Sequence, residues 1–346
     1  MKKLRNFIKD KRIYILNTAI ILIIFFCACY IKDVYPFSGR TLAESDALMQ
    51  YQPMLYNFIE KIRTGLLETY SFNNGFGAAT TFNFVYYLSS PLNILSIMFK
   101  TPNSMYLFNI VLRIILTGII SLFYFKKKTN NNFISLICSL AYTFCGWFIT
   151  YHSFTIWLDI YMIFPLFHYG LEQLIENNKC KLYIFTLSFI LITNFYLAFA
   201  ICLYTLVYYF YRSFQKKEKY FYRIRSFQII FFSTIIACLL SCFHLYLVYD
   251  SFIKIGILKG NIINLFERDI LNTISGIFYG QYNYLKTNSG ITFPNISLNS
   301  IFIMSFIYYY FNKNITLKEK IKTTLVTIFF ILHPNFFSGI PVRQIR

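Results

Sequence analysis

Charged residues are scarce in this sequence, and acidic ones are the scarcest. Asp, Glu, Lys and Arg make up 14% of the 346 residues, hydrophobic residues make up 57%, and only 14 residues are acidic. An ordinary soluble domain carries about a quarter of its residues as charged side chains. The composition therefore excludes a soluble globular protein and indicates an integral membrane protein.

Cysteine and histidine are also few, with eight Cys and four His residues in the chain. The cysteines lie mostly inside apolar runs, and Cys180 lies in a short basic loop. No Cys or His spacing matches a zinc site, and the pattern does not indicate a disulfide framework. We interpret the cysteines as small apolar packing residues and expect no cofactor.

The apolar residues form runs that are long enough to cross a bilayer, which takes about 20 helical residues. Residues 13–31 and 227–249 are two such runs. The first follows a basic N-terminus, is too long for the core of a signal peptide and lacks a small-residue cleavage site. We therefore expect it to remain as an anchor, and we predict a multi-pass protein of the bacterial cell membrane.

The net charge of +19 comes from Lys and Arg residues that cluster in short segments between apolar runs. This is the positive-inside pattern of membrane proteins, so we expect a lipid bilayer and no nucleic acid as partner. The five basic segments are 1–12, 126–128, 179–181, 212–225 and 313–322. We place all five in the cytoplasm, and the N-terminus with them.

The number of crossings between basic segments then constrains the topology. Residues 32–104 become a first extracytoplasmic loop and residues 250–297 a second. Residues 182–211 must cross an even number of times, which predicts two short helices that turn at 194–196. The apolar stretch 82–99 contains Pro91 and cannot be a single span, so it lies at the outer interface or dips into it. Further helices are predicted at 105–125, 133–151, 156–175, 227–249, 298–312 and 323–334.

The first loop carries a helical pattern of its own. Ser45 is placed to cap a helix and Gly65 to end it, and apolar residues recur on one face between them, at Leu48, Tyr51, Leu55, Phe58, Ile59 and Ile62. Polar residues occupy the opposite face. Such a helix is predicted to lie along the membrane surface.

Three charged residues stand out as candidates for chemistry. Asp46 lies at the start of the predicted surface helix, where it either stabilises the helix dipole or acts as a general base at the membrane boundary. Asp159 lies in an apolar run, where acids are costly. It either makes a structural pair, with His152 or Tyr161, or contacts substrate. Arg113 raises the same question, because it either snorkels to the interface or is paired internally, or it contacts substrate.

Several motifs together resemble the bacterial YfhO-type membrane protein family, over roughly residues 14–330. They are Ser45-Asp46, Gln50-Tyr51-Gln52-Pro53, SFNNGFGAATTFNFVYYLSSPLNIL (71–95), Trp157-Leu158-Asp159 leading to Pro165, Gly170-Leu171-Glu172 and Asn194-Phe195-Tyr196. The resemblance implies an all-α polytopic membrane protein, a C-type glycosyltransferase-like transmembrane bundle with juxtamembrane helices in the first outer loop. The whole chain is then one transmembrane domain, 1–346.

The resemblance also implies a reaction, the transfer of a hexosyl group with inversion from a polyprenyl-phosphate donor to a cell-envelope glycan or lipoteichoic-acid type acceptor. Asp46 becomes the candidate base and Glu44 the second choice. Substrate-binding candidates are Gln50, Tyr51, His152, Trp157, Asp159, Lys254 and Arg268, and His152, Lys254, Lys259 and Arg268 are candidates to stabilise the leaving phosphate. A divalent metal is compatible with the number of acids, although no spacing is diagnostic.

Two other functions remain open at this level. A transporter or flippase for a lipid-linked sugar should show internal repeats and broken helices around a midplane site, and no inverted repeat is visible. The third interpretation is an inactive remnant. Members of the resembling family are longer, and residues 332–346 begin a new segment without completing a bundle, so we expect a C-terminally truncated product.

Overall fold

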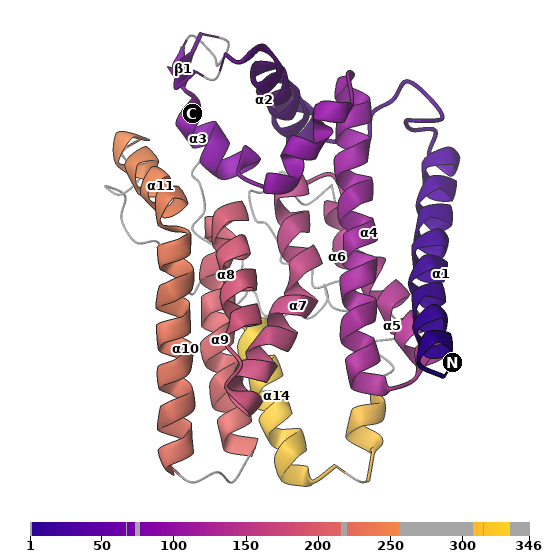
Figure 1. Ribbon diagram of the computed structural model, residues 1–346, viewed down its shortest axis with the longest axis vertical. Coiled ribbons are helices and arrows are strands. Elements are labelled where there is room, and N and C mark those ends of the chain that lie inside the picture. Colours follow the sequence, from indigo (N-terminus) through magenta and orange to yellow (C-terminus); the bar gives the residue numbers. More distant parts are fainter. Residues whose placement is uncertain are drawn as a thin grey trace. The chain divides into compact units, whose positions relative to one another are not determined.

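The computed structural model describes residues 2–66, 68–72, 77–215, 220–255, 307–313 and 315–332, which are almost entirely helical (Figure 1). Of the described helices, four are long and apolar enough to cross a membrane, or five when one bent pair counts as a single span. The chain forms two compact units. The first comprises Met1–Thr143, Tyr151–Phe195 and Gln228–Leu258, and the second comprises Phe144–Thr150, Tyr196–Phe227 and Lys259–Arg346.

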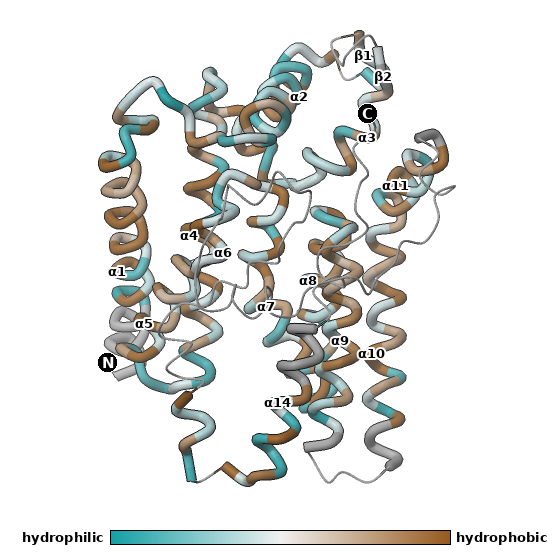
Figure 2. The backbone as a smooth tube through the Cα atoms, turned by 180° about the vertical axis from the view of Figure 1, so that it is seen from behind, coloured by the Kyte–Doolittle hydropathy of each residue, from teal (hydrophilic) through white to brown (hydrophobic). Residues whose placement is uncertain are grey.

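Long apolar helices build the first unit. They are α1 (Lys2–Ile31), α4 (Pro102–Thr129), α5 (Asn132–Thr143), α7 (Thr155–Asn177) and α8 (Lys181–Thr193). Helix α4 contacts α1, α5 and α7, and α7 in turn contacts α8. Apolar residues dominate α1 and α4 along most of their length (Figure 2). A helix suits such runs because it satisfies every backbone polar group internally, which a bilayer demands.

Small and polar residues join α1, α4 and α5. The Asn17 side chain of α1 donates hydrogen bonds to the Gly118 carbonyl of α4 at 3.0 Å and to Ser139 Oγ of α5 at 3.2 Å. Ser139 Oγ also donates to the Gly118 carbonyl at 3.0 Å. Helices in lipid associate through such close approaches and buried hydrogen bonds, because lipid offers no hydrophobic driving force.

An ion pair joins α4 and α7 near their C-terminal ends. Lys128 Nζ of α4 lies 2.5 Å from Glu172 Oε2 of α7. His168 Nε2, one turn earlier on α7, lies 3.5 Å from Glu172 Oε1. The four-residue spacing of these two α7 residues places them on one face of the helix.

The segment between α1 and α4 folds over one end of these helices (Figure 1). It contains a π-helical turn η1 (Ala47–Tyr51), helix α2 (Gln52–Thr64), the antiparallel strands β1 (Tyr70–Ser71) and β2 (Ala78–Ala79), the short helix α3 (Thr80–Asn83), a second π-helical turn η2 (Phe84–Leu88) and the 3₁₀ helix η3 (Pro91–Met98). Gly65 ends α2 with a φ of 71°, a left-handed conformation that suits glycine.

The arrangement confirms several of the predicted elements. Helix α4 covers 105–125, a turn at 152–154 precedes α7, and the helices on either side of Asn194 are separate, with α9 running Phe195–Gln215. Residues 82–99 are divided among α3, η2 and η3 and do not form a single span. Pro91 is the first residue of η3, a position where its missing N–H leaves no partner unsatisfied.

Other predictions were wrong in detail. The run 227–249 is not one straight helix, because α10 (Tyr220–Leu240) and α11 (Cys242–Ile255) meet at an angle of 71°. The contacts of α11 with α3 and η2 account for its change of direction. Ser45 does not cap a helix. It adopts a φ of 51°, and its carbonyl, not its hydroxyl, accepts from Leu48 and Met49. Leu48 is exposed, and Ala47 takes its place in the buried face.

Two more ranges differ from expectation. The predicted helix 133–151 is interrupted at 144–145 between α5 and α6 (Gly146–Tyr151), and α14 (Leu317–Leu332) begins before residue 323. The second unit contains α14, where the Thr323 hydroxyl lies 2.8 Å from that of Tyr309 and 3.4 Å from that of Tyr211 in α9. Most of the predicted second loop, 250–297, and most of the helix 298–312 lie outside the described residues.

Candidate functional site

Asp46 is an exposed acid at the start of η1. Within the described part of the chain, its carboxylate accepts no hydrogen bond and forms no ion pair, and the same holds for exposed Glu44. Two other acids of this segment are paired. Glu60 pairs with Arg63, and Glu68 lies 3.2 Å from Lys61 Nζ. Asp46 is therefore free of the partners that would hold its negative charge.

The charge of Asp46 influences the pKa of three tyrosines. Burial is the largest cause that raises the pKa of Tyr51, Tyr86 and Tyr87. With all causes acting together, the pKa of Tyr87 is about 12. The Asp46 carboxylate raises the pKa of all three further, because a negative charge disfavours a second one nearby. The phenols therefore remain protonated at neutral pH and can donate hydrogen bonds beside this carboxylate.

The tyrosines belong to two π-helical turns that meet. The Tyr87 hydroxyl of η2 donates a hydrogen bond of 2.7 Å to Gln50 Oε1 of η1, and the Tyr87 and Tyr51 rings lie 4.9 Å apart. The Tyr86 and Tyr87 rings pack edge to face at 4.6 Å. π-Helical turns are rare and occur frequently at functional sites, where the extra residue per turn redirects side chains.

Further aromatic rings connect these turns to the start of α7. The Phe154 ring lies 5.5 Å from Tyr51 and stacks on Trp157 at 5.0 Å, and Tyr151 lies edge-on to Trp157 at 4.9 Å. Phe154 and Trp157 are half-buried. The sequence-predicted residues Gln50, Tyr51 and Trp157 thus belong to one continuous cluster, and Asp46 lies beside it.

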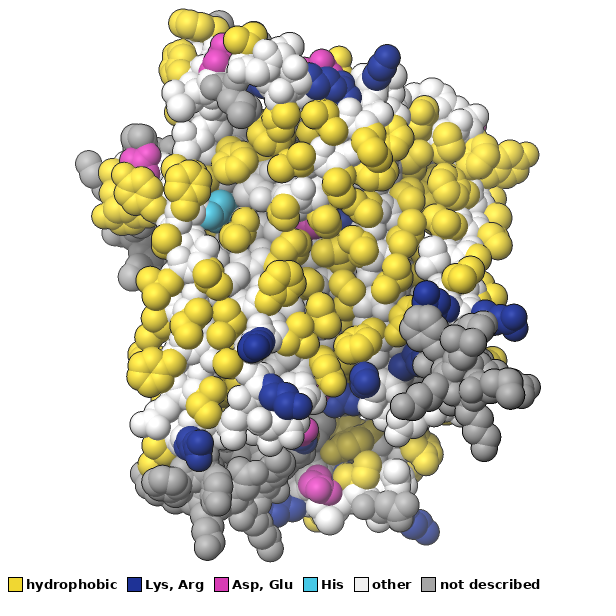
Figure 3. Space-filling view, viewed as in Figure 1, with side chains coloured by type: hydrophobic (Ala, Val, Ile, Leu, Met, Phe, Trp, Pro, Cys, Tyr) yellow, Lys and Arg dark blue, Asp and Glu magenta, His cyan; other side chains and the backbone are white. Residues whose placement is uncertain are grey.

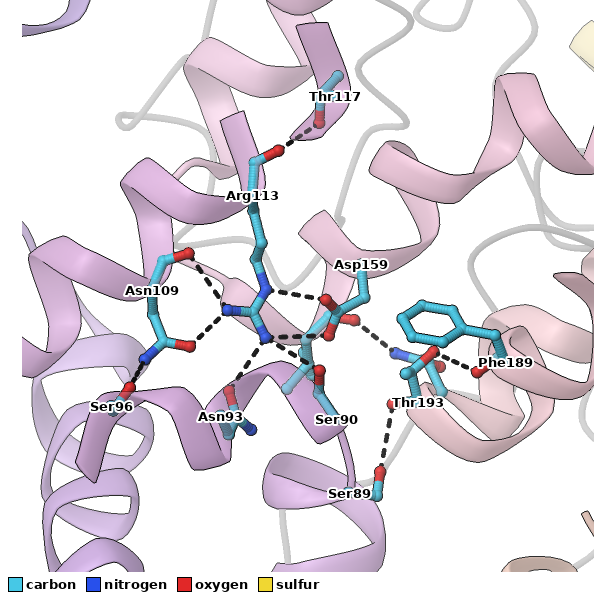
Figure 4. Close-up of polar contacts among 12 residues, drawn as sticks. Ser89, Ser90, Asn93, Ser96, Asn109, Arg113, Thr117, Asp159, Phe189 and Thr193 are labelled. Carbon is cyan, nitrogen blue, oxygen red and sulfur yellow. Dashed lines mark hydrogen bonds and ion pairs between the residues drawn. The ribbon is translucent and has the colours of Figure 1, made fainter. Parts of the chain in front are cut away.

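A buried ion pair lies on the bundle side of this cluster, between α4 and α7 (Figure 4). Arg113 Nε donates to Asp159 Oδ1 at 2.9 Å and Arg113 Nη2 donates to Asp159 Oδ2 at 3.1 Å. The exposed fractions of the two side chains are 1% and 0%. Arg113 and Asp159 are therefore each other's partners, which corrects the suggested pairing of Asp159 with His152 or Tyr161.

The same guanidinium binds the segment that carries the tyrosines. Arg113 Nη2 donates to Ser90 Oγ at 3.2 Å and to Asn93 Oδ1 at 3.0 Å. Arg113 Nη1 donates to the Asn109 carbonyl at 3.2 Å and also to its side-chain oxygen. Asn109 Nδ2 in turn donates to Ser96 Oγ of η3. Asp159 is thus enclosed in this network, with no exposed surface through which to meet a ligand.

The remaining predicted residues are only partly placed. His152 is half-buried in the turn before α7. Lys254 lies in α11, and Lys259 and Arg268 lie outside the described residues. Within the described ranges, no group of three His, Cys, Asp or Glu side chains is arranged to hold a metal ion.

Sequence reasoning did not select Tyr86, Tyr87, Ser90 and Asn93 as site residues. All four lie within the stretch 71–95, which carried part of the family resemblance. Helical and irregular backbone alternate in this stretch, so its apolar residues follow no clear helical or strand period. Its side chains could therefore not be assigned to a face from the sequence. Their placement opposite η1 required the three-dimensional arrangement.

Comparison with known proteins identifies one family. The family model described as bacterial membrane protein YfhO matches residues 17–336, which is most of the chain. No curated protein matches the sequence. No solved structure matches it either.

Proposed function

The chain belongs to the YfhO family of bacterial membrane proteins, and we propose that it is a membrane glycosyltransferase. In this proposal, a sugar passes from a polyprenyl-phosphate donor to a cell-envelope glycan or teichoic-acid acceptor, with inversion at the anomeric carbon. Asp46 takes the proton from the attacking hydroxyl of the acceptor. The donor's isoprenoid chain stays in the bilayer beside the apolar helices.

The observation that supports the proposal is the Asp46 carboxylate, which has no hydrogen-bond or ion-pair partner among the described residues and lies beside an aromatic cluster. A general base must be accessible and free to accept a proton. Asp46 meets these conditions, whereas Asp159 is buried against Arg113. Glu44 is also exposed, but only Asp46 influences all three tyrosines.

The aromatic cluster suits a sugar as ligand. Binding sites for small molecules combine apolar and aromatic walls with a few polar groups that fix orientation. The half-buried rings of Tyr86, Phe154 and Trp157 offer faces for the C–H surface of a pyranose. Gln50 and Tyr87, which are hydrogen-bonded to each other at 2.7 Å, offer amide and hydroxyl groups for sugar hydroxyls.

The distribution of positive charge supports an extracytoplasmic site. Figure 3 shows hydrophobic side chains over the face of α4, α7 and α8, with Lys and Arg side chains gathered mainly around the helix ends remote from α2. Lys126, Lys127 and Lys128 are in the last turn of α4. Gln52, which follows Asp46 by six residues, donates a hydrogen bond of 2.8 Å to Asn103 in the first turn of the same helix. By the positive-inside rule, this distribution of charge supports a cytoplasmic N-terminus and an extracytoplasmic Asp46 in the proposal.

The leaving phosphate also needs stabilisation as charge develops on it. His152 is the nearest sequence-predicted candidate along the chain to the aromatic cluster, between Tyr151 and Phe154. Lys254, Lys259 and Arg268 are the other three candidates in this proposal. A cation at this position would act on the donor, whereas Asp46 acts on the acceptor, so the two roles can be separated by mutation.

The test uses the full chain purified into lipid vesicles, with polyprenyl-phosphate hexose or N-acetylhexosamine labelled in the sugar. Asp46→Asn should lower transfer to a teichoic-acid or glycan acceptor by about 10²- to 10⁴-fold, the usual contribution of a general base. Glu44→Gln is the matched control and should retain transfer. Both variants should insert and unfold as the parent does, because neither side chain has a hydrogen-bond partner among the described residues.

Three results would count against the proposal. Equal transfer by the parent and Asp46→Asn would remove Asp46 from the mechanism. Loss of transfer in Glu44→Gln alone would move the base to Glu44. Label that crosses the bilayer while it remains lipid-linked, with no transfer, would identify a flippase instead.

A further inference from the structure

The segment 84–98 carries two tyrosines of the site on backbone that is not continuous helix. The π-helical turn η2 ends at Leu88, residues 89 and 90 are non-helical, and η3 starts at Pro91. Ser89 and Ser90 are buried, with 8% and 5% of their surface exposed. Buried irregular backbone needs partners for its polar groups and is tolerated at membrane depth only where protein surrounds it.

Arg113 supplies much of the polar support that this break requires. One side of its guanidinium binds the helices, through Asp159 of α7 and Asn109 of α4. Its Nη2 group, which also donates to Asp159 Oδ2, reaches Ser90 and Asn93, on either side of the start of η3. Arginine suits this task because its five N–H groups form a rigid planar fork that several acceptors can share.

We propose that Arg113 is a positioning residue, which fixes segment 84–98 against α4 and α7 and thereby holds Tyr86 and Tyr87 beside Asp46. Asp159 serves as the counter-ion that keeps the guanidinium in place. The consequence for sugar transfer rests on the proposed function, whereas the consequence for the position of the segment does not.

A second ion pair between the same helices shows what a purely structural pair looks like. Lys128 and Glu172 also join α4 to α7, at 2.5 Å, and Lys128 additionally lies over the Tyr124 ring. Lys128 follows Arg113 by 15 residues in α4, which is about 22 Å along the helix. If the Arg113 pair served only to hold the two helices together, the two pairs should be interchangeable in their effects. The proposal predicts that they are not.

The test measures the exposure of the segment directly. In a full chain whose eight native cysteines are replaced, Ser89→Cys introduces a thiol at a site that is 8% exposed. Its rate of modification by a membrane-impermeant maleimide reports how often the segment lifts from the bundle. A second chain keeps only the native Cys29, which is 2% exposed in α1, and reports general unfolding.

Arg113→Lys is the decisive variant, because lysine keeps the charge that faces Asp159 but cannot bridge to Ser90 and Asn93. It should raise the modification rate at position 89 by about tenfold to a hundredfold, as expected for the loss of a charge-assisted hydrogen bond. Asn93→Ala leaves the ion pair intact and should raise the same rate in the same direction. Neither variant should change the modification of Cys29, and Lys128→Met should change neither rate.

The proposal is overturned if Arg113→Lys leaves the rate at position 89 unchanged, or raises it together with that of Cys29, or if Lys128→Met has an equal effect. In the transfer assay, Arg113→Lys should lower kcat/KM, because Tyr86 and Tyr87, which the proposed function assigns to sugar binding, lose their fixed position. The thiol assay needs no turnover. If the protein does not transfer sugar, the modification rate at position 89 therefore still tests whether Arg113 positions segment 84–98.

Discussion

Gly170 offers the sharpest test of the packing between α7 and α8. A Cβ atom at this position would lie 2.9 Å from the Tyr183 backbone nitrogen, 3.1 Å from the Leu182 carbonyl carbon and 3.2 Å from Tyr183 Cα. All three atoms belong to the backbone of α8, which cannot rotate away as a side chain can. Gly170→Ala therefore has to push two packed helices apart.

The magnitude follows from two opposing effects. Overpacking of a well-packed interior costs about 1–3 kcal/mol, and the upper part of this range applies because only backbone can yield. Alanine gains about 1 kcal/mol over glycine in a helix interior. The net effect should be a loss of about 1–2 kcal/mol of unfolding free energy.

Two other glycines calibrate the measurement. A Cβ at Gly118 would meet Ile21 Cδ1 at 2.1 Å, the flexible end of a side chain, so Gly118→Ala should cost less than Gly170→Ala. A Cβ at Gly39 would meet nothing within 4 Å, so Gly39→Ala should stay within about 0.5 kcal/mol of the parent. Unfolding by SDS in mixed micelles, followed by circular dichroism, gives the three midpoints. A Gly170→Ala protein as stable as Gly39→Ala would refute the close approach of α7 and α8.

Two further predictions concern single hydrogen-bonding side chains. Asn17→Ala should lower the unfolding free energy by about 1 kcal/mol in the same SDS titration, because it removes the bonds from α1 to Gly118 and Ser139, and interhelical hydrogen bonds in membranes have this order of strength. An unchanged midpoint would mean that α1 is held by apolar contacts alone. Tyr87→Phe should lower sugar transfer about fivefold, as for one neutral hydrogen bond, and should lower the midpoint no more than Asn17→Ala does, because it removes the single bond to Gln50. Transfer at the parental rate would exclude the Tyr87 hydroxyl from the site.

Most helices of this protein could be predicted because they depend on the hydropathy and charge of residues that are close together in the sequence. The run 105–125 became α4, and Gly65 ended α2 because a left-handed residue was needed there. The even number of crossings between basic segments also excluded a single span at 82–99, and the structure divides that stretch at 89–90. These properties are local or additive, so the sequence alone is sufficient for them.

The partners of the buried charges could not be predicted in the same way. Arg113 and Asp159 are 46 residues apart and were recognised separately as costly intramembrane charges. No periodicity joins α4 to α7, and pairing with His152 was equally compatible with the sequence. The bend between α10 and α11 was missed for a related reason, because it depends on contacts of α11 with α3 and η2, which are distant in the chain.

The retention of a buried ion pair is itself informative about the site. Desolvation of two charges offsets most of their attraction, so a well-packed hydrophobic pair of equal volume would stabilise α4 against α7 equally well or better. Helix pairing alone therefore gives little reason to keep Arg113. A hydrophobic pair, however, could not satisfy Ser90 and Asn93 at the break between η2 and η3. The Arg113–Asp159 pair is best explained by the irregular segment 84–98 that it anchors. The irregular backbone of that segment is in turn explained by Tyr86 and Tyr87, which it brings to Asp46.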